Sequence, residues 1–284
     1  MQSVKEYQIR PLDTSPGGLR EISDLFARGQ RDLPGRQASL DWQYNQNPAG
    51  LALGFNAYSQ GLLVAHYAAI PIKARLFGKV CAGILSINTR TDPAHQRQGL
   101  FYRLAELTYA QAREANCEFV IGVANQNSVH GFTKKLGFQL VGLLETRFVA
   151  HPVAIPETGR DFAVVWDRPA VAWRLSNPGR KYYYHRSSRG RGLLLGRSGH
   201  FSVLVGTVDA SAVPVGIAER PRSFNPFLLW IGTNGAATWK HSFSMTVPQA
   251  LKPVPLNLIF RDLRENRKLS LEGTWFWAMD FDAY

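Results

Sequence analysis

The sequence predicts a mixed α/β fold, and three features carry that prediction. Apolar or alternating runs bounded by Gly, Pro or Asn recur between residues 51 and 88, which is typical of a meander of strands. Further on, Leu100, Leu104 and Leu107 recur at the spacing of a helix face. A strand-like run, a short helical segment and another strand-like run follow, and this order favours helices layered on a sheet.

The N-terminal part supplies a strand, a helix and a turn before the meander. Tyr7–Leu12 alternates weakly and predicts a strand, and Gly18–Gln30 carries its apolar residues at helical spacing. Asp41–Gly50 mixes aromatic residues with Asn, Pro and Gly, which predicts a turn. The strands of the meander are expected at Leu51–Tyr58, Gly61–Ile70 and Gly78–Asn88.

Helices and strands alternate in the middle of the chain. A helix is expected from Leu100 to Ala115 and a strand at Cys117–Ala124. Ser128 is a good N-cap residue, so a second helix is expected from there until just before Gly137. Strand-like residues over Gln139–Val149 complete this part.

The composition changes after Val149, and this change predicts two domains. The two prolines of His151–Gly159 indicate a linker or boundary, so we expect one domain over residues 1–150 and another over 151–284. Short apolar runs in the second part predict a β-rich α/β domain. They lie at Val164–Trp166, Leu193–Leu195, Phe201–Val208, Phe227–Gly232, Leu256–Phe260 and Trp275–Phe281.

The formal net charge of +12 favours anionic partners. No Asp or Glu occurs from Arg168 to Val208, where basic residues are frequent. Lys181–Arg191 adds three tyrosines and a histidine to this basic stretch. Three interpretations stay open: a solvated basic face, attraction of a phosphorylated substrate or cofactor, and, least favoured, nucleic-acid binding.

Several other classes of protein and site are disfavoured by the sequence. No apolar run is long enough to span a bilayer and the polar N-terminus lacks a secretory signal, so a cytoplasmic location is expected. Cys81 and Cys117 lie in strand-like segments and are expected to be buried thiols. The seven histidines show no metal-ligand spacing, and nucleophile-elbow and Walker motifs are absent. A homo-oligomer stays open.

The segment around Gly99 predicts a phosphate-binding turn. A strand ends near Asn88, a polar loop follows, and a helix begins at about Leu100. The unpaired N–H groups and partial positive charge of a helix N-terminus stabilise a pyrophosphate. Gly99 permits close approach of the phosphate, and Arg97 can add charge-assisted hydrogen bonds. Downstream, a second strand ends at Asn125, and two diverging strand ends can pair with an extended amide ligand such as pantetheine.

These residues resemble the GNAT superfamily of N-acyltransferases. QRQGLF at Gln96–Phe101 resembles the superfamily's phosphate-binding motif, and Asp92-Pro93 matches the pattern that precedes it. NQNSVHGFTKKLGF, which begins at Asn125, resembles its second signature. The resemblance covers roughly residues 5–150 and implies a mixed, mostly antiparallel, twisted sheet flanked by helices. The second part more loosely resembles a degenerate second GNAT fold, as in bacterial tandem proteins, and would contribute to the acceptor site.

The resemblance also implies a set of site residues. Acyl-CoA, as acetyl-CoA or another acyl-CoA, would be the co-substrate. Its pyrophosphate would be surrounded by Gln96, Arg97, Gln98, Gly99, Leu100 and Phe101. Its pantetheine arm would meet backbone groups of Thr89, Arg90 and Thr91, and Asn125 and Asn127 would contact the pantetheine or the acyl end. The acceptor would lie near the WQYNQNPAG segment, with Trp42, Tyr44, Asn45 and His66 as candidate contacts.

Two residues depart from the superfamily's pattern. Phe101 replaces a small residue at the end of the phosphate motif, and its side chain is expected to point into the core. Thr133 stands where many members carry a tyrosine that protonates the departing thiolate, and threonine is a much poorer acid. His130 is the first candidate for a general base, and the absence of a dedicated base stays open. The other candidates are His66, Asp92, His95 and Asn127.

The favoured function is acyl transfer from acyl-CoA to a small-molecule amine. A phosphorylated or nucleotide-linked amino sugar of surface-polysaccharide synthesis is the acceptor that the basic second part and the tandem resemblance suggest. The alternative is a non-catalytic module that senses CoA or binds nucleic acid through its basic part. Thr133 and the lack of a clear base favour that alternative.

Overall fold

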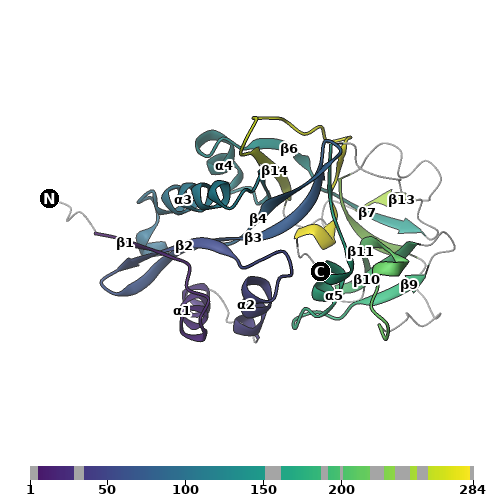
Figure 1. Ribbon diagram of the computed structural model, residues 1–284, viewed down its shortest axis with the longest axis horizontal. Helices are drawn as coiled ribbons and strands as arrows, with labels where there is room; N and C mark the ends of the chain where they lie inside the picture. The colour runs from purple at the N-terminus through teal and green to yellow at the C-terminus, as the bar shows by residue number, and fades with distance from the viewer. Residues whose placement is uncertain are drawn as a thin grey trace.

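The computed structural model describes residues 6–28, 35–150, 161–186, 191–198, 201–217, 227–233, 244–247 and 255–281. Within these residues the strands form two sheets (Figure 1). The first sheet has the strand order β1-β2-β3-β4-β5-β14-β6, with β8 pairing β3 and β15 pairing β8. Its strands are β1 (Gln8–Pro11), β2 (Leu53–Ser59), β3 (Leu62–Leu76), β4 (Lys79–Thr91), β5 (Phe119–Ala124), β6 (Gln139–Leu143), β8 (Phe162–Val164), β14 (Asn257–Asp262) and β15 (Thr274–Trp275).

Most neighbours in the first sheet are antiparallel, as the sequence predicted. Among the described strands of this sheet, only β4–β5 and β15–β8 pair in parallel. The second sheet follows the order β13-β7-β12-β11-β10-β9. Its strands are β7 (Glu145–Ala150), β9 (Tyr183–Arg186), β10 (Arg191–Ser198), β11 (Phe201–Asp209), β12 (Phe227–Gly232) and β13 (Ser244–Thr246). The fold is therefore α/β, with a second β-rich part.

Helices cover both faces of the first sheet (Figure 1). α3 (Leu100–Glu114) and α4 (Val129–Lys135) lie on one face, and α1 (Pro16–Ala27) and α2 (Arg36–Asn45) lie on the other. Side chains alternate between the two faces along each strand. Ile84 and Val120 accordingly pack with α3 and α4, while Leu85 and Ile121 pack in the core that contains α1 and α2.

The described residues also contain a fifth α-helix and short 3₁₀ segments. α5 (Arg168–Leu175) follows β8 and begins at Asp167, whose side chain accepts a hydrogen bond from the Ala170 N–H. The 3₁₀ segments are η1 (Pro93–His95), η2 (Ala210–Ala212) and η4 (Ala278–Phe281). None of the helices in the described residues is long and apolar enough to cross a bilayer.

The turn predicted at Asp41–Gly50 was wrong in its first half, because Asp41–Asn45 is the end of α2. Trp42 and Tyr44 are fully buried by contacts with distant segments, and these tertiary contacts favour helix over local turn propensity. The turn itself is confined to the residues after the helix, where the Gly50 N–H donates to the Asn47 carbonyl.

β3 also continues past its predicted end at Ile70. Pro71 has no N–H to donate, so it needs an unpaired position on the strand. Ala69 is the last residue of β3 that pairs with β2, and Ala74 is the first that pairs with β8 on the same edge, so Pro71 lies between the two paired segments. The proline is therefore tolerated within a long strand.

The two sheets do not follow the division predicted at residue 150. β7, from the first part of the chain, belongs to the second sheet, while β14 lies between β5 and β6 of the first. The linker expected at His151–Gly159 lies outside the described residues. The division into two domains stays a prediction.

Both cysteines are buried, as predicted. Cys81 and Cys117 are free thiols with exposed fractions of 8% and 5%. Burial raises the pKa of the Cys81 thiol to about 11, so the thiol is protonated at neutral pH.

Candidate functional site

A gap between β4 and β5 is the centre of the candidate site. The two strands pair in parallel only from Ile84–Ser86 to Val120–Gly122. Beyond these pairs β4 continues to Thr91 and β5 to Ala124, so the strands diverge. Diverging strands leave backbone groups that an extended ligand can pair with.

A β-bulge in β4 lies beside this gap. His66 pairs with Arg90 and Ala68 pairs with Ile87, so Asn88 and Thr89 together face the single residue between them on β3. Asn88 has a φ of 48°, in the left-handed region. A bulge of this kind re-aims side chains and frees backbone groups from the ladder.

On the α3 face, the predicted phosphate turn is open. Gln96–Gly99 are exposed, and Arg97 and Gly99 have φ values of 62° and 73°. A Cβ placed on Gly99 would meet nothing within 4 Å, so side chains of the described residues do not fill the turn. α3 starts directly after it, at Leu100, and presents the unpaired N–H groups of its first turn there.

Phe101, the departure from the phosphate motif, packs inward. Its ring lies 5.1 Å from that of Phe132 and 6.0 Å from that of Tyr67, measured between centroids. The bulky side chain is thereby kept out of the turn, which agrees with the orientation expected from the sequence.

The residues expected to meet pantetheine lie at the two strand ends. Thr89 is exposed, and the Arg90 guanidinium donates to the Arg28 carbonyl, which ties the end of β4 to the end of α1. The Asn125 side-chain oxygen accepts from the backbone N–H groups of Asn127 and Ser128, both at 3.0 Å. Ser128 is the N-cap residue of α4, as predicted, but its side chain makes no capping hydrogen bond, and the Asn125 oxygen accepts from the backbone there instead.

The candidate catalytic residues at α4 have few partners in the described part of the chain. Asn127 and His130 are exposed. The Thr133 hydroxyl donates to the Val129 carbonyl at 2.9 Å, within its own helix. Its proton is thus engaged by the backbone, which leaves the hydroxyl poorly suited to protonate a thiolate.

Two other candidate bases have structural partners. The Asp92 carboxylate accepts from the Ala94 N–H at 3.0 Å and pairs with Arg28 at 3.4 Å. The His95 imidazole is hydrogen-bonded to the Tyr7 hydroxyl at 3.1 Å. Both contacts hold η1 in place between β4 and the phosphate turn.

A large pocket opens on the opposite face of the sheet. Its volume is about 710 Å³, within the range of small-molecule sites. Ser86, Asn88 and Val123 belong to its wall, so the pocket reaches the gap between β4 and β5. The other lining residues come from segments far apart in the sequence: Phe26, Arg36, Ser39, Leu40, Gln43, Ile87, Asn177, Gly179, Arg180, Leu256 and Phe281.

The charge of this pocket is positive in the described residues. Arg36 and Arg180 line it, and no Asp or Glu is among its lining residues. The Arg36 guanidinium lies over the Phe26 ring, 5.3 Å from its centroid, which helps to hold the charge in place. Such a wall favours an anionic or phosphorylated ligand.

The residues expected to contact the acceptor lie behind this pocket and do not line it. Trp42 and Tyr44 are fully buried, and His66 is hydrogen-bonded to the Tyr44 hydroxyl at 2.9 Å. Asn45 donates to the Asp41 carboxylate and the Thr14 carbonyl. Their neighbours on α2, Leu40 and Gln43 among them, form the wall instead.

Trp42 joins two walls of the pocket through Trp173 of α5. The two indoles stack with centroids 4.5 Å apart and an interplanar angle of 13°. Each indole N–H donates to the other residue's carbonyl, at 2.9 and 3.0 Å. This reciprocal pair, the Trp42–Trp173 clamp, fixes α2 against the helix that leads to Asn177 and Arg180.

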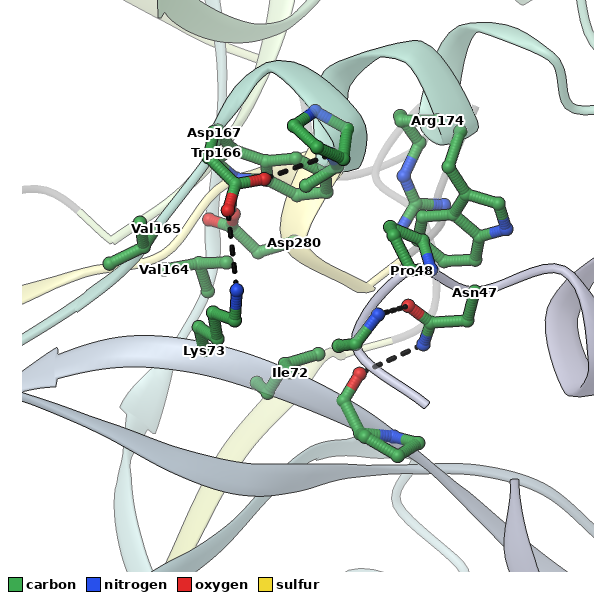
Figure 2. Close-up of a pocket in the computed structure, with 15 residues that line it drawn as sticks. Asn47, Pro48, Ile72, Lys73, Val164, Val165, Trp166, Asp167, Arg174 and Asp280 are labelled. Carbon is green, nitrogen blue, oxygen red and sulfur yellow. Dashed lines mark hydrogen bonds and ion pairs between the residues drawn. The ribbon is translucent and has the colours of Figure 1, made fainter. Parts of the chain in front are cut away.

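A second, smaller pocket lies beside the clamp (Figure 2). Its volume is about 100 Å³, and Trp166, Arg174 and Asp280 line it. The buried Asp280 carboxylate accepts from the Trp166 indole and from the Trp277 N–H, both at 2.7 Å. Burial raises the pKa of Asp280 to about 6. The Lys73–Asp167 ion pair, at 3.4 Å, also belongs to the wall of this pocket (Figure 2).

Sequence reasoning missed most residues of both pockets. Two sequence signals pointed to them. The basic stretch from Arg168 to Val208 contributes Trp173, Arg174 and Arg180, and the WQYNQNPAG segment contributes Asn47, Pro48 and Ala49 to the smaller pocket. Ser86, Val123 and Phe281 carry no local motif, and only the folded chain brings them together.

Comparison with known proteins rests on structure alone. No family model and no curated protein matches the sequence. A probable N-acyltransferase from Enterococcus faecalis V583 matches over 92% of this chain and 73% of its own, with 10% identity and a TM-score of 0.57.

Two proteins described as GCN5-related N-acetyltransferases give similar matches. The one from Kribbella flavida covers 90% of this chain and 71% of its own, at 11% identity and a TM-score of 0.58. The one from Anabaena variabilis ATCC 29413 covers 90% and 73%, at 10% identity and a TM-score of 0.58. The chain therefore has the GNAT fold that its sequence predicted.

Proposed function

We propose that this protein transfers an acyl group from acetyl-CoA or another acyl-CoA to a small-molecule amine. One observation carries the proposal. The gap between β4 and β5 has an open helix N-terminus on one side and a pocket of about 710 Å³ on the other. A thioester threaded through the gap would meet an acceptor held in the pocket.

The phosphate turn would hold the nucleotide end of acyl-CoA. Backbone N–H groups from Gln98 to Phe101 and the positive end of α3 suit a pyrophosphate, and Gln96 and Arg97 are exposed beside them. The pantetheine arm would follow the unpaired edge of β4 at Thr89, Arg90 and Thr91 and the strand end at Asn125 and Asn127.

The chemistry would take place where the bulge meets the gap. The acceptor nitrogen forms a bond to the thioester carbonyl carbon, the carbon–sulfur bond breaks, and the amine proton is lost to a base or to water. A backbone N–H of the bulge at Asn88–Thr89 would stabilise the negative charge that develops on the carbonyl oxygen. His130 and Asn127 remain the proposed catalytic side chains at the start of α4.

The acceptor would carry a negative charge in addition to its amine. Arg36 and Arg180 both line the pocket, and their positive charges support a phosphorylated or nucleotide-linked amino sugar of surface-polysaccharide synthesis as the acceptor. Trp42, Tyr44, Asn45 and His66 would support this pocket from behind. A CoA-sensing role without catalysis is the second candidate, because the Thr133 hydroxyl is engaged within α4.

Titration calorimetry with acetyl-CoA tests the CoA site. Gly99→Glu places a carboxylate where the phosphates would lie and should abolish binding. Gly78→Glu is the matched control, since Gly78 also has a positive φ, 85°, and open space around it. Equal affinity for wild type and Gly99→Glu would contradict the site. Release of CoA thiol with amino-sugar phosphates separates catalysis from sensing, since a sensor binds acetyl-CoA and releases none.

A further inference from the structure

A chain of three hydroxyl groups leads from the core beneath α3 to the gap between β4 and β5. The Tyr109 hydroxyl of α3 lies 2.6 Å from that of Tyr67 on β3, and the Tyr67 hydroxyl lies 2.7 Å from Oγ of Ser86 on β4. Both tyrosines are fully buried, whereas Ser86 is half-buried and belongs to the wall of the large pocket. The chain therefore has a closed end at Tyr109 and an open end at Ser86.

The closed end fixes the direction of the hydrogen bonds. Within the described residues, Tyr67 is the sole hydrogen-bond partner of the Tyr109 hydroxyl. A buried O–H group without an acceptor is unfavourable, so Tyr109 donates to Tyr67, and Tyr67 in turn donates to Ser86. Burial raises the pKa of Tyr67 to about 12, which keeps the proton on its hydroxyl at neutral pH.

Ser86 is then left with a proton to donate. Among the residues that the structure describes, none accepts a hydrogen bond from its hydroxyl, which is paired with Tyr67 alone. Ser86 and Gly122 form the last parallel pair before the strands diverge, and a Cβ on Gly122 would lie 3.2 Å from that of Ser86. The glycine thus leaves β5 without a side chain beside this hydroxyl, as strand glycines do where a ligand approaches closely.

The position of Ser86 relative to the bulge indicates which part of the co-substrate it would meet. With the pyrophosphate at Gly99 and the pantetheine arm along Thr91 to Thr89, the thioester carbonyl would lie at the bulge and the acyl chain beyond it. Ser86 lies two residues beyond Asn88, about 7 Å along the strand. A hydrogen bond of about 3 Å leaves about 4 Å, which is the reach of an oxygen on the third carbon of the acyl chain.

We propose that the Ser86 hydroxyl donates a hydrogen bond to an oxygen on the third carbon of the acyl chain, so that the protein prefers a 3-hydroxyacyl- or 3-oxoacyl-CoA to the unsubstituted acyl-CoA. Tyr67 and Tyr109 are positioning residues that direct the Ser86 proton into the gap. The inference rests on the proposed function for the place of acyl-CoA, and it adds the chemical class of the acyl group. An unsubstituted chain has no oxygen to accept this proton, which would be left unpaired on binding.

Titration calorimetry with three CoA thioesters of equal chain length tests the proposal. The probes are butyryl-CoA, 3-hydroxybutyryl-CoA and acetoacetyl-CoA. Both oxygen-bearing chains should bind wild type about tenfold more tightly than butyryl-CoA. Acetoacetyl-CoA is the decisive probe, because its ketone oxygen accepts a hydrogen bond and does not donate one. Equal affinity for acetoacetyl-CoA and butyryl-CoA would show that Ser86 does not donate, and would overturn the proposal.

Variants of the hydroxyl chain separate its members. Ser86→Ala should bind all three thioesters equally, while Ser86→Thr, which keeps a hydroxyl, should retain the preference. Tyr67→Phe should reduce the preference, because the Ser86 proton can then turn away from the gap. Tyr184→Phe, which changes a buried tyrosine of the second sheet, is the control and should behave as wild type. An unchanged preference in Ser86→Ala would overturn the proposal, and an unchanged preference in Tyr67→Phe would remove Tyr67 as a positioning residue.

Thiol release with an amine acceptor is measured separately from binding. A preference for the oxygen-bearing chains without turnover would leave Ser86 as the residue that selects the acyl group and contradict the proposed enzyme. Turnover without any preference among the three thioesters would do the reverse.

Discussion

At the scale of single residues, His66 shows how burial decides a side chain's role. The sequence made it a candidate base, but both ring nitrogens are engaged inside the protein, with Asn56 and Tyr44. A histidine whose pKa burial lowers to about 3 stays neutral throughout the range in which a general base must exchange protons.

The same burial predicts a pH dependence of stability. Between pH 3 and 6.5 the unfolded state binds a proton at His66 that the folded state does not, so stability falls as the pH falls through this window. From pH 7 to pH 5 the loss should be about 2 kcal/mol.

Urea unfolding at both pH values, compared between wild type and His66→Gln, measures this contribution. The comparison is needed because Asp280, whose pKa burial raises to about 6, has the opposite sign and stabilises the fold on acidification. The same difference between pH 7 and pH 5 in the variant would show that His66 is not the cause.

His130 gives a second prediction at this scale. If it is the base, His130→Ala should lower kcat well beyond threefold and leave the Kd of acetyl-CoA unchanged, because proton transfer by a positioned side chain contributes about 10²–10⁴-fold. Steady-state thiol release measures this. Turnover within about threefold of wild type would remove His130 from the mechanism and leave water to take the amine proton.

At the scale of elements, the Trp42–Trp173 clamp holds α2 and α5 together behind the large pocket. Trp173→Phe would leave the buried Trp42 carbonyl without its donor and remove part of the stack. We expect a loss of about 3 kcal/mol in the free energy of unfolding. The acceptor KM should rise, with little change in acetyl-CoA affinity, because the phosphate turn lies on the other face of the sheet.

Trp275→Phe is the control for that experiment. Trp275 stacks on Trp277, 4.7 Å away between centroids, and does not line the large pocket. Its replacement should lower stability without a change in the acceptor KM. A parallel rise of KM in both variants would indicate general loosening of the fold rather than a role for the clamp.

The elements also show what local sequence could predict. The phosphate turn was predictable, because one strand end, one glycine and one helix start lie together in sequence, as they do in the structure. The helical conformation of Asp41–Asn45 at the end of α2 was not predictable from local sequence. It depends on the burial of Trp42 against Trp173, more than a hundred residues away. The same holds for the wall of the large pocket, which Asn88 shares with Asn177 and Phe281.

At the scale of the whole molecule, the C-terminal part completes the first sheet. β14 pairs with β5 over six residues, Phe119–Ala124, and with β6 on its other side. The apolar run Leu256–Phe260 predicts a strand, but it does not indicate that this strand lies between two earlier ones, because strand order depends on the whole topology. Residues 1–150 alone would therefore lack a central strand.

A fragment of residues 1–150 should consequently show no cooperative thermal unfolding by circular dichroism. β5 and β6 would expose unpaired edges and the apolar side chains that now cover Phe260. A peptide of residues 255–284 added in trans should restore part of the transition. Cooperative unfolding of the fragment at the melting temperature of the full chain would show instead that residues 1–150 form an independent domain.

The most direct test of the central claim is a crystal structure with acetyl-CoA bound. The account predicts the pyrophosphate on the backbone N–H groups of Gln98–Phe101 and the thioester between Ser86 and Val123, facing Asn88. A nucleotide bound away from the α3 N-terminus, or a thioester that does not enter the gap between β4 and β5, would contradict it.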